Sequence, residues 1–104
     1  MKLQDERRAL RRARGYFQAE WELPEGRDSG LVRDISTGGC YVQSGRRVAV
    51  GSPVRIVVQM PSGNWIKALG VVAHRAPAGF GVRFKDLSER AQAEIQAVIR
   101  DLHF

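Results

Sequence analysis

The chain has 104 residues and a formal net charge of +6. This length suits one compact domain and is too short for two. Hydrophobic residues make up 43% of the chain, which favours a packed core over disorder. No apolar run is long enough to cross a bilayer, and the polar residues 1–6 are not typical of a signal peptide. Cys40 is the only cysteine, which excludes an internal disulfide and fits a cytoplasmic location.

The positive charge is concentrated at the N-terminus. Residues 1–14 hold six basic and two acidic side chains, which accounts for +4 of the formal net charge of +6. Because this segment has little apolar surface to bury, we expect residues 1–14 to form a flexible arm and residues 15–104 to form the folded domain. A basic arm favours an anionic partner, such as a nucleic acid, a nucleotide or a membrane surface. The alternative is a solubilising tail without a specific partner.

The rest of the chain alternates between short apolar-polar runs and turn residues. This pattern predicts six strands, at residues 15–23, 31–33, 40–42, 54–60, 65–75 and 80–84. Glycine and proline predict loops at 24–30, 44–47, 61–64 and 76–79. We expect Gly70 to mark a bend or bulge in the fifth strand. Short strands at this spacing are typical of a small antiparallel barrel or sandwich.

A helix follows the last strand. Ser88 suits its N-cap and Glu89 its first turn. Its apolar face is predicted to consist of Ala91, Ile95, Val98, Ile99 and Leu102. We expect this face to close one end of the barrel.

The sequence contains no recognisable catalytic or metal site. Neither His74 nor His103 has a second His, Cys or carboxylate at metal-ligand spacing, and no phosphate-binding loop of the Walker type is present. Trp21 and Trp65 are interpreted as core or barrel-rim residues. We therefore expect no enzymatic activity, no catalytic residue, no metal and no cofactor.

One stretch between the second and third strands combines several ligand-binding groups. The Asp34 carboxylate can accept hydrogen bonds from N–H donors of a ligand, and the Ser36 hydroxyl projects from the same side of an extended chain. Gly38 and Gly39 would allow close approach of a ligand and a positive φ where the chain turns. The alternative is a hairpin turn in which Asp34 and Ser36 bond only their own backbone.

Arginines of the arm could complete such a site. Arg8 and Arg12 are four residues apart, as are Arg7 and Arg11. A guanidinium group can bind phosphate or the O6/N7 edge of guanine through two parallel hydrogen bonds, and it can stack on a base.

Taken together, an Arg-x-x-x-Arg arm, Asp-x-Ser-x-x-Gly and a closing Gly-Phe-Gly-Val-Arg-Phe strand resemble a PilZ domain. The resemblance runs from about residue 6 to the end of the chain. It implies a mainly β fold, a six-stranded antiparallel β-barrel with a C-terminal helix. It also implies a bacterial receptor for the second messenger cyclic di-GMP.

The family motifs assign candidate ligand-binding residues. The first group comprises Arg7, Arg8, Arg12, Asp34, Ser36 and Gly39. In this group Arg8 and Arg12 match the two motif arginines, although Arg7 and Arg11 could serve instead. Arg7 would suit a stack of two ligand molecules. The second group comprises Arg11, Gly38, Arg75 and Arg83.

The resemblance suggests how such a receptor would signal. The arm would fold over one or two molecules of cyclic di-GMP, and this ordering would change the surface shown to a downstream protein partner. One alternative function is a small basic barrel that binds RNA or DNA, although its charge lies in the arm and not along a groove. Another alternative is a PilZ-like interaction module that needs no ligand.

Overall fold

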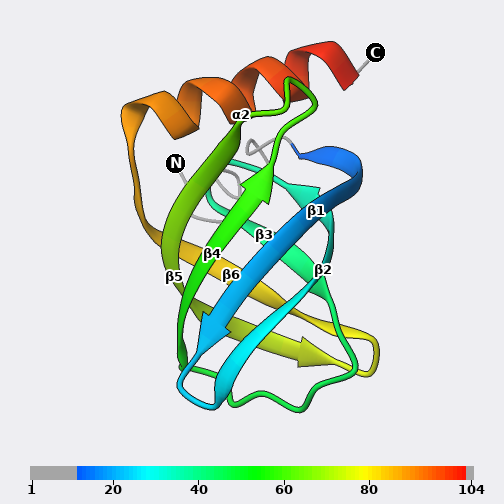
Figure 1. Cartoon of the computed structure of the whole chain (residues 1–104), viewed down its shortest axis with the longest axis vertical. Helices are drawn as coiled ribbons and strands as arrows, with labels where there is room; N and C mark the ends of the chain where they lie inside the picture. The colour runs from blue at the N-terminus through cyan, green and yellow to red at the C-terminus, as the bar shows by residue number, and fades with distance from the viewer. Residues whose placement is uncertain (1–11, 103–104) are drawn as a thin grey trace, which may run out of the picture.

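The computed structural model describes residues 12–102, which form six strands and one helix (Figure 1). The strands are β1 (Ala13–Leu23), β2 (Gly26–Ile35), β3 (Gly39–Gln43), β4 (Pro53–Gln59), β5 (Trp65–Ala76) and β6 (Gly79–Leu87). The helix is α2 (Glu89–Leu102). The predicted six-stranded antiparallel barrel with a C-terminal helix is confirmed.

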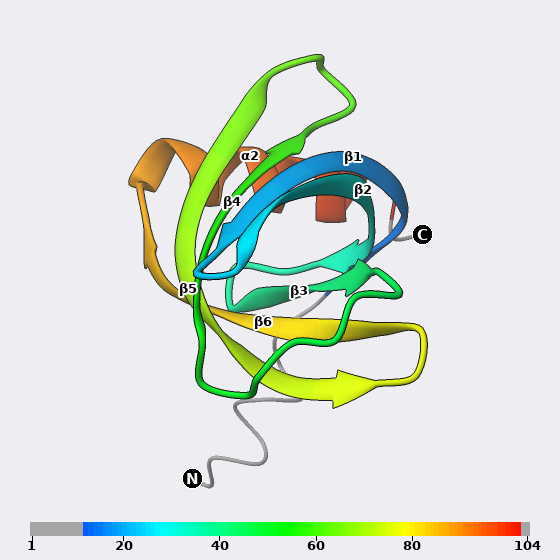
Figure 2. The same cartoon turned by 60° about the horizontal axis from the view of Figure 1, so that its bottom comes forward.

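The strands close into a barrel in the order β1-β2-β3-β6-β5-β4, and every neighbouring pair is antiparallel. Closure comes from β1, which pairs with β2 on one side and with β4 on the other. Figure 2 shows the strands encircling a common interior, with α2 beyond the far end. Because the sheet is closed, β1 and β4 have no free edge for pairing with another chain.

Alternating side chains fill the barrel. In β4, Val54, Ile56 and Val58 are buried, whereas Arg55 between them is exposed. The apolar face of α2 packs across one end of this core, mainly against β1 and β5 (Figure 1). Its buried residues are Ala91, Ile95, Val98 and Ile99. The side chain of Leu102, which completes the predicted face, is outside the described part of the structure.

Two local predictions from the sequence are confirmed. The Ser88 hydroxyl accepts a hydrogen bond from the Ala91 backbone N–H at 3.1 Å, which is the geometry of an N-cap. The pairing of β5 with β6 shifts register between Leu69 and Gly70, so Gly70 does mark a bulge. A Cβ atom at Gly70 would overlap the Arg83 carbonyl oxygen, which explains the glycine.

Several predicted strand boundaries were wrong; for example, β6 was predicted to end at residue 84 and continues to Leu87. Residues 26–30, expected in a loop, form the first half of β2, because they continue the ladder that Leu23 opens with Gly26. The turn narrows to Pro24 and Glu25, with Gly26 at a φ of 146°. In addition, β1 begins at Ala13, inside the predicted arm, because this side chain is buried and pairs with Ile35. Of the rest of that arm, Arg12 is described, and residues 1–11 lie outside the described residues.

Within residues 12–102, no helix has the length and apolar character needed to span a membrane.

Candidate functional site

The turn that joins β2 to β3 is held by Ser36. The Ser36 backbone N–H donates to the Gly39 carbonyl oxygen at 2.8 Å, which closes the turn. The Ser36 hydroxyl oxygen accepts from the Gly38 N–H at 3.1 Å, and the hydroxyl donates to the Gly39 carbonyl at 3.4 Å. Ser36 is fully buried, the only buried polar side chain within residues 12–102. Ser36 therefore bonds the backbone of its own turn, but it does not bond only this backbone, because its hydroxyl also accepts from Arg12.

The two glycines of the turn serve strand packing. Positive φ angles occur at Gly26, Gly51 and Gly63, so the positive φ expected at Gly38 and Gly39 is wrong. A Cβ atom at Gly39 would overlap the Val82 carbonyl oxygen, because β3 and β6 approach closely there. This contact requires a glycine whether or not a ligand binds.

Arg12 connects the turn to the carboxylate. Its Nε atom donates to Oδ1 of Asp34 at 2.7 Å, and its Nη2 atom lies 2.5 Å from the same oxygen in an ion pair. Its Nη1 atom donates to the Ser36 hydroxyl oxygen at 3.3 Å. Asp34 thus bonds an arginine and not its own backbone. One guanidinium group bridges the two polar residues of the motif, which lie 22 and 24 positions away in the sequence.

Within residues 12–102 the Asp34 carboxylate has unused hydrogen-bonding capacity. Arg12 Nε donates to Oδ1 and Nη2 pairs with the same oxygen, whereas Oδ2 accepts no hydrogen bond from these residues. The Arg12 side chain is 42% exposed and that of Asp34 is 28% exposed. An ion pair so open to water contributes about 0–1 kcal/mol, so a ligand could share or rearrange it at little cost.

Cys40 lies on β3, two residues after Gly38, and its buried side chain borders the site from the core. Burial raises the pKa of the Cys40 thiol to about 12, with the Arg12 charge opposing and the Asp34 charge reinforcing this shift. Cys40 is therefore a neutral core residue at physiological pH and does not act as a nucleophile. Within residues 12–102, no three His, Cys, Asp or Glu side chains gather in a way that could hold a metal ion.

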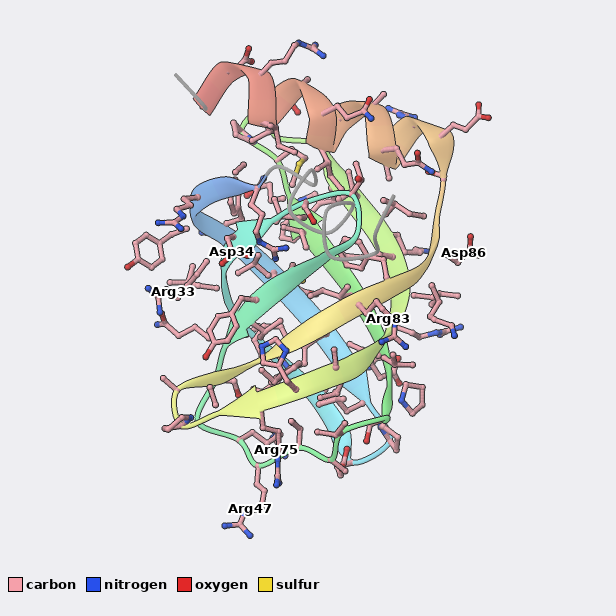
Figure 3. All side chains as sticks on the ribbon, turned by 180° about the vertical axis from the view of Figure 1, so that it is seen from behind. Arg33, Asp34, Arg47, Arg75, Arg83 and Asp86 are labelled. Carbon is pink, nitrogen blue, oxygen red and sulfur yellow. The ribbon has the colours of Figure 1, made fainter. Side chains whose placement is uncertain are left out.

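The predicted residues divide between two ends of the barrel. Arg12, Asp34, Ser36, Gly38 and Gly39 lie together, and Arg83 is paired with Gly39 across β3 and β6. Figure 3 shows Asp34 toward the α2 end.

Arg75 is not part of this group. It lies with Arg47 at the opposite end of the barrel (Figure 3), and its Nη1 atom donates to the Val48 carbonyl oxygen at 3.3 Å. Arg7, Arg8 and Arg11 lie outside the described residues.

Sequence reasoning overlooked a second aspartate–arginine pair, between Asp28 on β2 and Arg46 in the loop after β3. Arg46 Nε donates to Oδ2 of Asp28 at 2.8 Å, and this bond lowers the pKa of Asp28 and raises that of Arg46. It also overlooked Arg33 and Tyr41, which flank the motif. Alternation of polar and apolar residues predicted the strands that carry Arg33 and Tyr41. Only the register of the closed sheet shows which side chains lie next to them.

Comparisons with known proteins agree with this architecture. The family model described as PilZ domain matches residues 6–101. No curated protein sequence matches the chain at a significant level.

Solved structures include two with the same fold. One is the Bacillus subtilis inhibitor of motility MotI/DgrA, with a TM-score of 0.76 and 20% identity over 91% of this chain. The chain spans 50% of the length of that protein. The other is the PilZ domain of CeSA from a cellulose-synthesizing bacterium, with a TM-score of 0.65 and 13% identity. That match covers 89% of this chain and 98% of the other.

Proposed function

Because the chain belongs to the PilZ domain family, we propose that it is a bacterial receptor that binds the second messenger cyclic di-GMP. The observation that supports this proposal most strongly is the contact of Arg12 with both Asp34 and Ser36. A partly exposed cation and carboxylate meet there above a buried hydroxyl group, and within residues 12–102 one carboxylate oxygen accepts no hydrogen bond. These are the groups that a guanine nucleotide requires.

The chemistry of the ligand fits these groups. The N1–H and N2–H₂ donors of guanine suit Oδ2 of Asp34, which accepts no hydrogen bond from residues 12–102. Its O6 and N7 acceptors and the phosphates suit the Arg12 guanidinium, which is partly exposed. The buried Ser36 hydroxyl fixes the turn that holds these groups and helps to orient the Arg12 side chain.

The proposal extends to the N-terminal arm. Arg7, Arg8 and Arg11 would close over the bound ligand, and this ordering would change the surface that a protein partner meets. On this basis the chain acts in the cytoplasm as an adaptor and performs no catalysis itself. Folding of the arm on binding consumes part of the binding free energy, so a dissociation constant on the order of micromolar is expected.

Calorimetric titration with cyclic di-GMP tests the proposal. Replacing Asp34 with alanine removes a charge-assisted contact and should weaken binding by roughly 10- to 100-fold, equivalent to about 1.5–3 kcal/mol. Asp28→Ala is the matched control, because Asp28 also lies on β2 and also binds one arginine. This control should bind the ligand as the wild type does.

GTP and a short RNA serve as ligand controls in the same titration. Binding of cyclic di-GMP that is equal in the wild type and Asp34→Ala would contradict the proposed site. Binding of RNA alone, with an affinity that falls steeply with salt, would identify a nucleic-acid-binding barrel instead. No binding of any ligand would indicate an interaction module that acts without one.

A further inference from the structure

A cation and two rings form a continuous row on the outer surface of the barrel. The Arg33 guanidinium carbon lies 6.0 Å from the centre of the Tyr41 ring. The Tyr41 and His74 ring centres are 6.4 Å apart, and the ring planes are inclined by 27°. The three residues come from β2, β3 and β5, so the row crosses the sheet.

The two rings lie over the glycines of β6, which supplies no side chain at these positions. A Cβ atom at Gly81 would overlap the His74 ring, and one at Gly79 would lie 2.9 Å from atoms of the Tyr41 ring. His74 is exposed and Tyr41 is half-buried, as expected for rings with one face against the sheet and the other toward solvent. The result is a row of two nearly parallel rings beside the β6 backbone, with the Arg33 guanidinium over the Tyr41 ring.

This surface begins next to the candidate binding site. Asp34 is paired with Tyr41 across β2 and β3, Tyr41 with Gly81, and Gly81 with His74. Neighbouring strands lie roughly 5 Å apart, so the nearer ring is one strand from Asp34 and the farther ring three strands. Arg33 and Asp34 share one side of the barrel (Figure 3). A ligand with two bases, held at Asp34 by one base, therefore has the second base within reach of the rings.

We propose that Tyr41 and His74 form a stacking platform for a nucleobase of the bound cyclic dinucleotide, with the Arg33 cation over the Tyr41 ring at one end of the row. This inference rests on the proposed function and adds to it a recognition surface outside the two sequence motifs. Aromatic side chains bind bases through their faces, and a neighbouring guanidinium strengthens such stacking. The platform contributes affinity for a planar base, while Asp34 recognises the hydrogen-bonding edge of guanine.

A purely structural role for the rings makes a different prediction. Rings that only shield the glycines of β6 would contribute to stability and would leave ligand affinity unchanged. The two roles are separated by measuring binding and thermal unfolding on the same variants.

The test compares two replacements at one position by calorimetric titration with cyclic di-GMP. His74→Leu keeps apolar bulk over Gly81 but removes the planar ring, and His74→Phe keeps a ring. Removal of one base–aromatic stack should weaken binding about 5- to 150-fold in His74→Leu. His74→Phe should bind within a factor of about three of the wild type. Tyr41→Leu should weaken binding in the same direction, which provides a second site if one variant fails to fold.

Trp65→Leu is the matched control, because Trp65 is another exposed aromatic residue on β5 and lies away from the row. It should leave affinity unchanged.

The set of variants separates the two proposals. Folded His74→Leu and Tyr41→Leu proteins that bind as the wild type does, while Asp34→Ala does not, would overturn the platform and leave the proposed function intact. A wild-type protein that does not bind cyclic di-GMP would overturn both. If that protein instead bound a short RNA in a His74-dependent manner, the platform would belong to an RNA-binding surface and the assignment to a cyclic dinucleotide would be wrong.

Discussion

Asp28 and Asp34 lie on the same strand and each accepts a hydrogen bond from an arginine, yet their environments differ. Both oxygens of Asp28 are occupied, Oδ1 by the Ser29 N–H at 3.3 Å and Oδ2 by Arg46 at 2.8 Å. In Asp34 the hydrogen bond from Arg12 Nε and the ion pair with Nη2 both involve Oδ1, and no donor within residues 12–102 reaches Oδ2. Asp34 is therefore the carboxylate with capacity for a ligand, and Asp28 serves to fix the loop that carries Arg46.

Cys40 provides a prediction on pH at the scale of a single residue. Its pKa is about 12 in the folded protein, above the ordinary thiol value of about 8.5. The folded state therefore holds the proton more tightly than the unfolded state. The corresponding stability is fully present below about pH 8.5 and is lost as the pH rises toward 12. Between these values the free energy of unfolding should fall by up to about 1.4 kcal/mol per pH unit from this thiol alone.

Urea unfolding of the wild type and of Cys40→Ala, from pH 7 to pH 10.5, measures this contribution. Other titrating groups affect both proteins equally, so the difference in free energy of unfolding isolates Cys40. The wild type should lose stability more steeply above pH 8.5. Parallel pH profiles for the two proteins would show that Cys40 does not contribute.

At the scale of elements, the site depends on the close approach of β3 and β6. Gly39 pairs with Arg83, and the Gly38 carbonyl accepts a hydrogen bond from the Phe84 N–H at 2.9 Å. These contacts hold the turn that carries Ser36. The motif glycine is thus as much a requirement of the barrel as of a ligand.

Gly39→Ala should therefore destabilise the protein even without ligand. Its methyl group would overlap the Val82 carbonyl oxygen, and such overpacking costs about 1–3 kcal/mol. Gly45→Ala is the control, because no atom lies within 4 Å of a Cβ built there. Thermal unfolding should show a lower midpoint for Gly39→Ala only. Equal midpoints for both variants would assign Gly39 a role in binding alone.

The arm yields a second prediction at this scale. If residues 1–11 close over cyclic di-GMP, the ligand should slow tryptic cleavage after Arg7, Arg8 and Arg11 by about tenfold or more. Cleavage in the exposed loop at Arg46 and Arg47 provides an internal comparison and should not change. Mass spectrometry of the first fragments distinguishes the sites. Equal protection of both segments would indicate general stabilisation and not closure of the arm.

At the scale of the whole molecule, strand alternation and turn residues predicted a small antiparallel barrel or sandwich with a closing helix, and the resemblance to PilZ domains favoured the barrel. These patterns failed for residues 26–30, because glycine and polar residues typical of a loop continue the ladder of a long hairpin. The site was predictable only in part. The sequence identifies Asp34 and Ser36, but their meeting with Arg12 depends on the pairing of β1 with β2.

Register explains the remaining errors. Arg75 and Arg83 were equivalent candidates in the sequence, yet β6 places Arg83 opposite Gly39 while Arg75 lies at the other end of the barrel. Position 39 requires a glycine because the Val82 carbonyl oxygen lies against it. Val82 is more than 40 residues away in the sequence, so no local pattern indicates this contact. Long-range pairings of this kind are set by the closed sheet as a whole.

The most direct measurement is an NMR titration of the ¹⁵N-labelled protein with cyclic di-GMP, in which backbone amide signals are followed residue by residue. We predict saturable shifts at Asp34, Ser36 and Gly38, with Arg46 and Arg47 at the other end of the barrel unchanged. Shifts confined to the Arg46–Arg47 end, or no saturable shift at all, would contradict the assignment of this site to cyclic di-GMP.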